Sequence, residues 1–407
     1  MSFVTHLESA IDGTHLAAGT LQTVHANRPL WVRYDLAAIR AAVRREDLAG
    51  RAPDMWRYRE LLPMDDATEI VSLGERMTPL LDCPRLAAHL GIDQLTIKDE
   101  SGLPTGSFKA RGMAMAVTMA KRLGVTKVAA PTAGNAGGAL AAYAARAGLE
   151  CYVFMPGDTP VVNQLEVPLY GGRAFRVDGL IHHCGAIVRE GKTRLGWFDM
   201  STLREPYRIE GKKTMGLELA EQLGWRLPDS IFYPTGGGTG LIGMWKAFSE
   251  LDALGWLDDP QRPRMHACQS SGCAPIPTAF ARGERFGEEF ANAHTLASGL
   301  RVPSALGDFM VLDAVRQSGG RAVAAEESRL RDWMRLAARL EGVALCPESA
   351  ACLEAIARGR AEGWVGKSER TVVFNTGAAQ KYVEVMQVEL PEVQRAAVDW
   401  ERIATGI

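Results

Sequence analysis

The sequence predicts an α/β protein built from two doubly wound lobes, each with a mostly parallel sheet covered by helices. From residue 76 onward, short apolar runs rich in Val, Ile and Phe alternate with longer segments of helical periodicity. The apolar runs are nearly continuous, which is typical of strands buried on both faces of a parallel sheet. Glycine-rich turns follow more than one of these strands, and this repetition favours two lobes over one.

The order of these segments also predicts the domain organisation. We expect residues 1–75 to form a polar, partly helical extension that packs on the larger lobe. Residues 76–105 and 216–407 should form that large lobe, and residues 106–215 a small mobile one, with candidate hinges at 171–172 and 206–211. The expected strands are 95–97, 127–130, 151–155, 231–233 and 371–374, and the expected helices are 110–123, 136–147, 214–223, 241–254 and 327–340.

Composition excludes several classes of function. The 407-residue chain holds 46 Lys+Arg against 48 Asp+Glu, a net charge of -2, so it has no basic excess for nucleic acid or an anionic membrane. No signal peptide and no apolar span is evident, which predicts a cytoplasmic protein. Seven cysteines without a C-x-x-C pair argue against disulfides and zinc. We interpret His182-His183 as a polar turn and expect no metal site.

The first segment that carries chemistry is PTGSFKARG at residues 104–112, which leads into a predicted helix. Lys109 and Arg111 would lie in the first helical turn, where the helix dipole disfavours cations, so a bound anion is expected nearby. A lysine in an apolar, electropositive setting has a lowered pKa and becomes a nucleophilic amine able to form a Schiff base. The alternative is an ordinary solvated lysine on a surface helix.

Two further segments join a predicted strand to a predicted helix. In VAAPTAGNAGG at residues 128–138, Asn135 offers a donor and an acceptor at a strand end, although it could simply cap the following helix. In IFYPTGGGTG at residues 231–240, consecutive backbone N–H groups lie beside a helix N-terminus and predict a site for one compact phosphate. Neither P-loop nor dinucleotide spacing is present, which favours one phosphate over a nucleotide. The alternative is a purely structural glycine turn.

The fourth segment is TVVFNTG at residues 371–377, where a buried strand ends in a polar pair. Thr376 could present a hydroxyl to a heteroatom of a bound ring, although this segment taken alone favours an ordinary strand-end turn. A lysine, an amide, a phosphate site and a hydroxyl together form the set of groups that holds pyridoxal phosphate (PLP).

In the order and content of these segments the chain resembles the fold type II PLP-dependent enzymes, whose fold is similar to tryptophan synthase β, and most of all the threonine synthases. The resemblance covers roughly residues 60–385 and includes SLGE at 72–75, TPL at 78–80 and EPYRIEGKKT at 205–214. It implies a possible homodimer that acts on a small amino-acid substrate. The implied reaction converts O-phosphohomoserine and water to threonine and phosphate by γ-elimination and β-hydration.

The resemblance also implies roles for individual residues. Lys109 would form the Schiff base with PLP and move the proton of the substrate's Cα, and Asn135 would bind the phenolate oxygen of the ring. Thr376 would face the pyridine nitrogen, where a neutral hydroxyl suits elimination better than transamination. The backbone N–H groups that would bind the cofactor phosphate are those of Gly236, Gly237, Gly238, Thr239 and Gly240. The expected substrate contacts are Thr105, Ser107, Thr132 and Arg208.

Other functions remain open where the chain departs from this pattern. Ala136, Gly137 and Gly138 offer no hydroxyl for a substrate phosphate, and the carboxylate of Glu205 would repel it unless cations compensate, for which Arg76, Arg208 and Lys212 are candidates. A PLP-dependent threonine or serine dehydratase (ammonia-lyase) would need no second phosphate site, and a β-replacement enzyme acting on O-phosphoserine is a third option. A PLP carrier without catalysis and a nicotinamide-dependent dehydrogenase are weaker alternatives.

Overall fold

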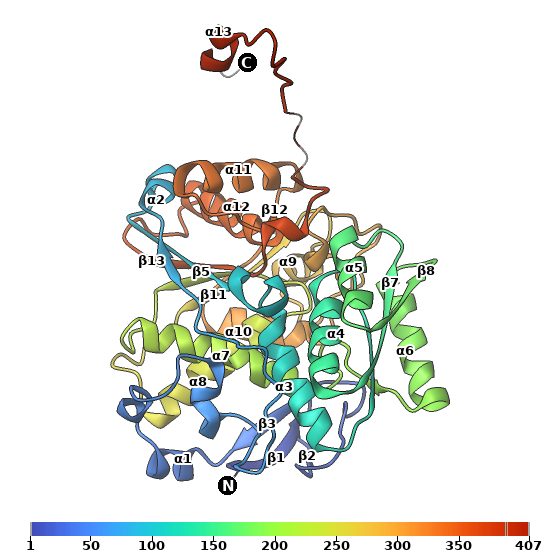
Figure 1. Cartoon of the computed structure of the whole chain (residues 1–407). Helices are drawn as coiled ribbons and strands as arrows, with labels where there is room; N and C mark the ends of the chain where they lie inside the picture. The colour runs from blue at the N-terminus through green and yellow to red at the C-terminus, as the bar shows by residue number, and fades with distance from the viewer. Residues whose placement is uncertain (1, 387, 389, 406–407) are drawn as a thin grey trace.

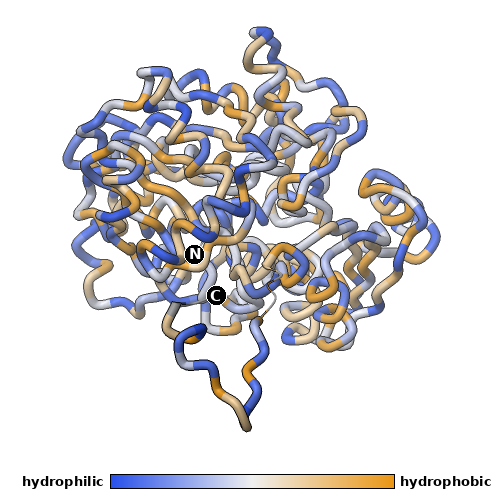
Figure 2. Tube along the Cα trace, turned by 90° about the horizontal axis from the view of Figure 1, so that it is seen from above, coloured by the Kyte–Doolittle hydropathy of each residue, from blue (hydrophilic) through white to orange (hydrophobic). Residues whose placement is uncertain are grey.

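The computed structural model describes residues 2–386, 388 and 390–405, which fold around three sheets. The N-terminal region is blue at the bottom of Figure 1, and the last helix, α13 (Trp400–Thr405), projects away from the body at the top. Hydrophobic residues are spread through the whole body of the molecule rather than gathered in one part of the chain (Figure 2). The buried ones form several separate hydrophobic cores.

The N-terminal region contains an antiparallel sheet of order β2-β1-β3, made of β1 (Val4–Ser9), β2 (His15–Leu16) and β3 (Leu30–Tyr34). Helix α1 (Leu36–Ala42) follows it and packs on helix α8. The prediction of a partly helical extension missed this sheet, because its strands are short and bury few apolar residues. Leu7, Leu30 and Val32 are fully buried there, in the same core as helices α3 and α4.

The second sheet is fully parallel, with the order β8-β7-β6-β9. All its strands lie between residues 106 and 215, inside the expected small lobe. Helices α4 and α6 both contact β7, and α3 and α5 flank α4. The elements are α3 (Lys109–Arg122), β6 (Lys127–Pro131), α4 (Asn135–Ala147), β7 (Glu150–Pro156), α5 (Val161–Leu169), β8 (Arg173–Val177), α6 (Ile181–Leu195) and β9 (Phe198–Asp199).

The third sheet has six strands in the order β12-β11-β10-β13-β5-β4 and is parallel except for the edge pair β4–β5. Its strands come from residues 80–99 and 230–375, so they lie within the expected large lobe; the exact domain boundaries remain a prediction. The elements are β4 (Leu80–Asp82), α2 (Pro84–Leu90), β5 (Gln94–Asp99), α7 (Tyr207–Gln222), β10 (Ser230–Pro234), α8 (Thr239–Leu254), β11 (Arg264–Ser270), α9 (Pro275–Ala281), α10 (Asp308–Gln317), β12 (Ala322–Ala325), α11 (Leu330–Glu341), α12 (Pro347–Ala361) and β13 (Arg370–Asn375). Short 3-10 turns cover residues 45–48, 55–61, 100–102, 104–106, 298–300, 327–329 and 379–381.

The α/β prediction with mostly parallel sheets is confirmed, and each expected strand and helix overlaps an observed one. One local interpretation was wrong, because His182 and His183 lie in the first turn of α6 rather than in a polar turn. Residues 207–211 begin helix α7, and the candidate hinge at 206–211 stays a prediction. All seven cysteines are free and buried.

Within the described part of the chain, none of the helices has both the length and the apolar character needed to span a membrane.

A buried network of charges fixes the start of helix α3. The guanidinium of Arg111 donates to Glu100 at 2.7 and 2.9 Å and to Glu218 of α7 at 2.8 Å, with all three side chains fully buried. Lys98 of β5 also donates to Glu218, at 2.5 Å. The anion expected beside Arg111 is therefore a pair of the protein's own carboxylates. The network ties α3, α7 and β5 together one helical turn or less from Lys109.

Replacing Arg111 by Met should destabilise the fold by about 3–5 kcal/mol, because it leaves two buried carboxylates without their partner. Arg122→Met on the same helix is the matched control, because the pair of Arg122 with Asp65 is partly exposed and should be worth about 0–1 kcal/mol. Urea unfolding of both variants measures the difference. Equal losses in the two variants would contradict the role assigned to the network.

Candidate active site

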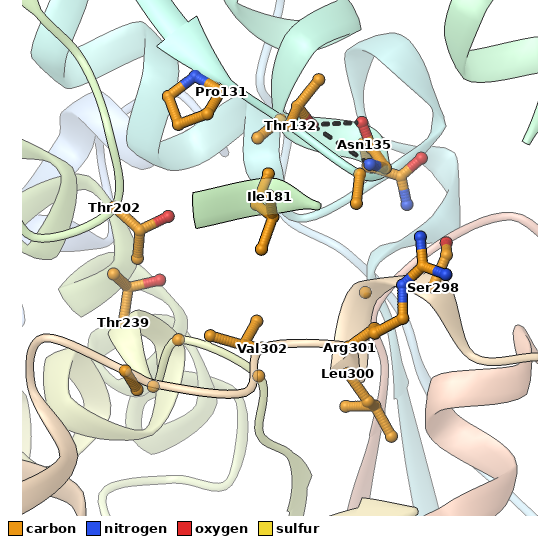
Figure 3. Close-up of a pocket in the computed structure, with 18 of the residues that line it drawn as sticks. Pro131, Thr132, Asn135, Ile181, Thr202, Thr239, Ser298, Leu300, Arg301 and Val302 are labelled. Carbon is orange, nitrogen blue, oxygen red and sulfur yellow. Dashed lines mark hydrogen bonds between the residues drawn. The ribbon is translucent and has the colours of Figure 1, made fainter. Parts of the chain in front are cut away.

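A cavity of about 450 Å³ opens where strands of two sheets end. Its walls include the last residues of β6 and β10 and the segment after β13, together with the first turns of helices α3, α4, α8 and α12. Open parallel sheets bind ligands at these carboxyl ends of strands. Figure 3 shows Thr132 and Asn135 on one side of the cavity, and Ser298, Arg301 and Val302 on another.

Lys109 is the first residue of α3 and lines this cavity. Desolvation by the surrounding protein, followed by the positive charge of Arg208, lowers the pKa of Lys109 to about 7. Its Nζ lies 3.9 Å from the centroid of the Phe108 ring. A large fraction of Lys109 is therefore an uncharged amine near neutral pH, which is the form that attacks carbonyl carbons.

Arg208, in the first turn of α7, is the one of the three expected cations that reaches the cavity. It is buried, and its Nη1 donates to the carbonyl of Met200 at 2.8 Å, while Nε has no hydrogen-bond partner among the described residues. Lys212 is buried behind Phe108 and donates to the Phe108 carbonyl. Arg76 is exposed, and neither Lys212 nor Arg76 lines the cavity.

Glu205 does not line the cavity but stabilises the start of helix α7. Its carboxylate accepts hydrogen bonds from the backbone N–H groups of Tyr207 and Arg208 at 2.7–3.2 Å, and so caps the start of α7. Burial raises the pKa of Glu205 to about 7. Glu205 should therefore repel a substrate phosphate less than the sequence suggested. Its carboxyl group lies outside the cavity wall, and it is partly protonated near neutral pH.

Asn135 begins α4 and belongs to a chain of hydrogen bonds along the cavity wall. Its Nδ2 donates to the Tyr382 hydroxyl at 3.0 Å, and its Oδ1 accepts from Asn163 at 2.9 Å. The Tyr382 hydroxyl donates to Glu348 at 2.8 Å. These contacts fix the orientation of the Asn135 amide, which a simple helix cap would not require.

The glycine-rich loop at residues 236–240 joins β10 to α8, and all five of its residues line the cavity. Gly238 has a φ of 85°, a conformation that favours glycine, and a Cβ there would clash with Val311. A Cβ on Gly237 would lie 2.7 Å from the Thr202 side chain. Thr239 and Gly240 open α8, so their N–H groups have no acceptor within the helix and are available to an anion.

Thr376 follows β13, is buried, and lines the cavity. Its hydroxyl lies 3.6 Å from the thiol of Cys346, and burial raises the pKa of that thiol to about 12. The thiol beside the Thr376 hydroxyl is therefore uncharged near pH 7. Its backbone is held by Ser349 and Phe108, which fixes its position relative to α3.

The expected substrate contacts divide into two groups. Thr132 and Arg208 line the cavity, but the Thr132 hydroxyl already donates to the Gly134 carbonyl at 2.8 Å (Figure 3). Thr105 and Ser107 lie outside the cavity wall, with buried hydroxyls that have no partner among the described residues. Their segment pairs with the loop after β13 through the Ser107–Gly377 bridge.

Several residues of the cavity were not predicted from the sequence. Tyr382, Thr202 and the segment 298–306 come from irregular connections without a motif, so no pattern in the sequence could place them. Arg189 of α6 and Arg204 also line the cavity. Burial, with a contribution from the charge of Arg189, lowers the pKa of Arg204. Among the described residues, neither these two arginines nor Arg208 has a carboxylate within 4.0 Å.

Comparison with known proteins identifies the family. Residues 71–377 match the family model described as "Pyridoxal-phosphate dependent enzyme". The threonine synthase of Methanocaldococcus jannaschii is 35% identical over 354 residues, which cover 86% of each chain. The threonine synthase of Mycobacterium bovis is 32% identical over 343 residues, 84% of this chain and 92% of that protein.

Solved structures agree on the fold. Maize serine racemase superposes with a TM-score of 0.64 at 23% identity, covering 75% of this chain and 88% of that one. The processed form of threonine deaminase isoform 2 from Solanum lycopersicum has the same TM-score at 20% identity, with coverages of 83% and 96%. The segments that suggested fold type II from the sequence all lie in or beside the matched region. The chain therefore belongs to the pyridoxal-phosphate-dependent enzymes of fold type II and, within them, to the threonine synthase family.

Proposed function

We propose that this protein is a carbon–oxygen lyase that uses PLP to convert O-phosphohomoserine and water to threonine and phosphate. The observation that carries the proposal is one cavity that holds both the amine of Lys109 and the glycine-rich loop at the start of α8. Membership of the threonine synthase family supplies the reaction. A small amino-acid substrate, a homodimer and a cytoplasmic location are further parts of the proposal.

The cavity residues fit PLP. The open backbone of residues 236–240 suits its phosphate, since side chains on this loop would clash and helix α8 directs its positive end there. The amide of Asn135 suits the phenolate oxygen, and the neutral hydroxyl of Thr376 suits the pyridine nitrogen. Lys109, with its lowered pKa, supplies the amine that binds the aldehyde carbon.

When bound, PLP withdraws electrons from the Cα of the amino acid and so makes loss of its proton feasible. The Nζ of Lys109 then takes that proton and later returns one, because it is the uncharged amine at the cavity wall. The neutral hydroxyl of Thr376 would not favour a protonated pyridine nitrogen as a carboxylate in its place would, which suits elimination better than transamination.

A second anion, the phosphate of the substrate, needs positive charge in the same cavity. Arg189, Arg204 and Arg208 line it without an ion pair to a carboxylate of the described residues, and the Nε of Arg208 lacks a partner. They can replace the hydroxyl groups that Ala136, Gly137 and Gly138 do not provide. Guanidinium groups suit this task because they bind phosphate in a bidentate manner.

Changing Gly238 to Ala should weaken retention of PLP by about tenfold, the effect of losing one hydrogen bond to a charged group. The added Cβ strains the backbone at a φ of 85° and pushes against Val311, which moves the N–H groups of the loop. Gly224→Ala, at a φ of 64° with nothing within 4 Å of the new Cβ, is the matched control. Equilibrium dialysis of PLP measures both, and equal retention in the two variants would argue against the phosphate site.

The purified protein should release phosphate and form threonine in equal amounts from O-phosphohomoserine. The assay is repeated with O-phosphoserine, threonine and serine, because the loop at Ala136 offers no hydroxyl to a substrate phosphate. 2-Oxobutyrate with ammonia from threonine, without any phosphate release from O-phosphohomoserine, would replace the proposal by a dehydratase. Ion chromatography of phosphate with amino-acid analysis distinguishes these outcomes.

A further inference from the structure

Three side chains of the N-terminal sheet, outside the cavity, have the composition of a metal site. His6 and Glu8 lie on β1 and His15 lies on the neighbouring strand β2, where it pairs directly with Glu8 (Figure 1). Among the described residues this is the one set of three His, Cys, Asp or Glu side chains suited to hold a metal ion, with ligand atoms all within 4.8 Å of one another. The sequence alone predicted no metal site, because these residues match no standard ligand spacing.

The geometry of the strands brings the three donor atoms together. Side chains alternate along a strand, so His6 and Glu8 share one face of β1, while Leu7 between them is fully buried in the core. The Oε2 atom of Glu8 lies 3.7 Å from Nε2 of His6 and 3.9 Å from Nε2 of His15. The two imidazole rings stack with their centroids 3.8 Å apart. One carboxylate oxygen and two ring nitrogens therefore converge on the outer face of the sheet.

The spacing of these atoms suits a shared ion better than direct hydrogen bonds. Distances of 3.7 and 3.9 Å are too long for hydrogen bonds, and Nε2 of His6 is buried without a hydrogen-bond partner among the described residues. A tetrahedral zinc ion with bonds of about 2.1 Å holds its ligand atoms about 3.4 Å from one another. Both observed distances lie within about 0.5 Å of that value, and rotation of the exposed His15 side chain can close the difference.

Neighbouring residues hold His6 and Glu8 in the form that binds metal. The Thr5 hydroxyl donates its proton to the Arg33 carbonyl at 3.2 Å, so its oxygen accepts from Nδ1 of His6 at 2.9 Å. This bond leaves the lone pair of the His6 ring on Nε2, which faces Glu8. The guanidinium of Arg33 donates from Nε to Oε1 of Glu8 at 3.1 Å, which leaves Oε2 for the two histidines. Second hydrogen bonds of this kind orient the ligands of protein metal sites.

We propose that His6, Glu8 and His15 bind one Zn²⁺ ion, which clamps β1 to β2. Two imidazoles and one carboxylate are ligands that zinc prefers, and water fills the fourth position. Leu7 beside the site belongs to the same hydrophobic core as helix α3, so the ion stabilises the packing of the N-terminal sheet on that helix. The site is separate from the cavity and does not depend on the proposed function.

Zinc titration of the PLP-loaded protein tests the proposal, with protein that lacks a histidine tag and has been treated with a chelator. Competition with a chromophoric chelator should report one zinc ion per chain. His15→Gln should weaken binding by about 100-fold or more, since loss of an outer-shell partner alone costs about 10–100-fold. The His15 side chain is 66% exposed, so this variant should fold. Thermal unfolding is the second readout, because zinc should raise the Tm of the wild-type protein but not that of His15→Gln.

His25→Gln is the matched control. His25 lies in the same N-terminal region and pairs with Asp12 at 3.5 Å, but it belongs to no such set of three among the described residues. This variant should bind zinc as the wild-type protein does. Glu8→Gln, which keeps the size of the side chain and removes its charge, should weaken binding as His15→Gln does. Absence of zinc binding by the wild-type protein, or equal affinity in the wild-type protein and His15→Gln, overturns the proposal.

Discussion

The chemistry of this protein depends on keeping one lysine amine uncharged in the wall of the cavity. The two largest effects that lower the pKa of Lys109 are desolvation, which comes first, and the nearby positive charge of Arg208. Both require that α3 and α7 start at fixed positions. The buried pairs of Arg111 with Glu100 and Glu218 fix α3 against α7, and the carboxylate of Glu205 caps α7 beside Arg208. The charges of the core therefore set the reactivity of the site.

The site combines parts from both parallel sheets and from segments far apart in the sequence. The amine and the amide begin α3 and α4, which adjoin the four-stranded sheet, whereas the glycine-rich loop and Thr376 follow β10 and β13 of the six-stranded sheet. Glu348 and Tyr382 join the two groups through Asn135. The cavity also carries three arginines without carboxylate partners among the described residues, which suits a substrate with an anionic side chain.

The fold and the centre of the site were predictable because they reside in local patterns. Apolar runs between helices predicted β5, β6, β7, β10 and β13, and strand–glycine–helix segments located Asn135 and the loop at 236–240. The N-terminal sheet was not predicted because its short strands alternate weakly. Tyr382, Thr202 and the arginines of the cavity were missed because only tertiary packing brings them there. Glu205 and Lys212 are the opposite case: the sequence suggested that they act on a substrate phosphate, but in the structure they make hydrogen bonds to the backbone outside the cavity wall.

The most direct measurement is the pH dependence of acylation at Lys109 in protein freed of PLP, followed residue by residue with peptide mass spectrometry. An amine reacts only when deprotonated, so the rate at Lys109 should rise with pH and reach half its maximum near pH 7. Exposed lysines of the same sample provide the internal reference. A half-maximum near the ordinary value of 10.5 would contradict the account, because Lys109 would then be a charged and unreactive group at neutral pH.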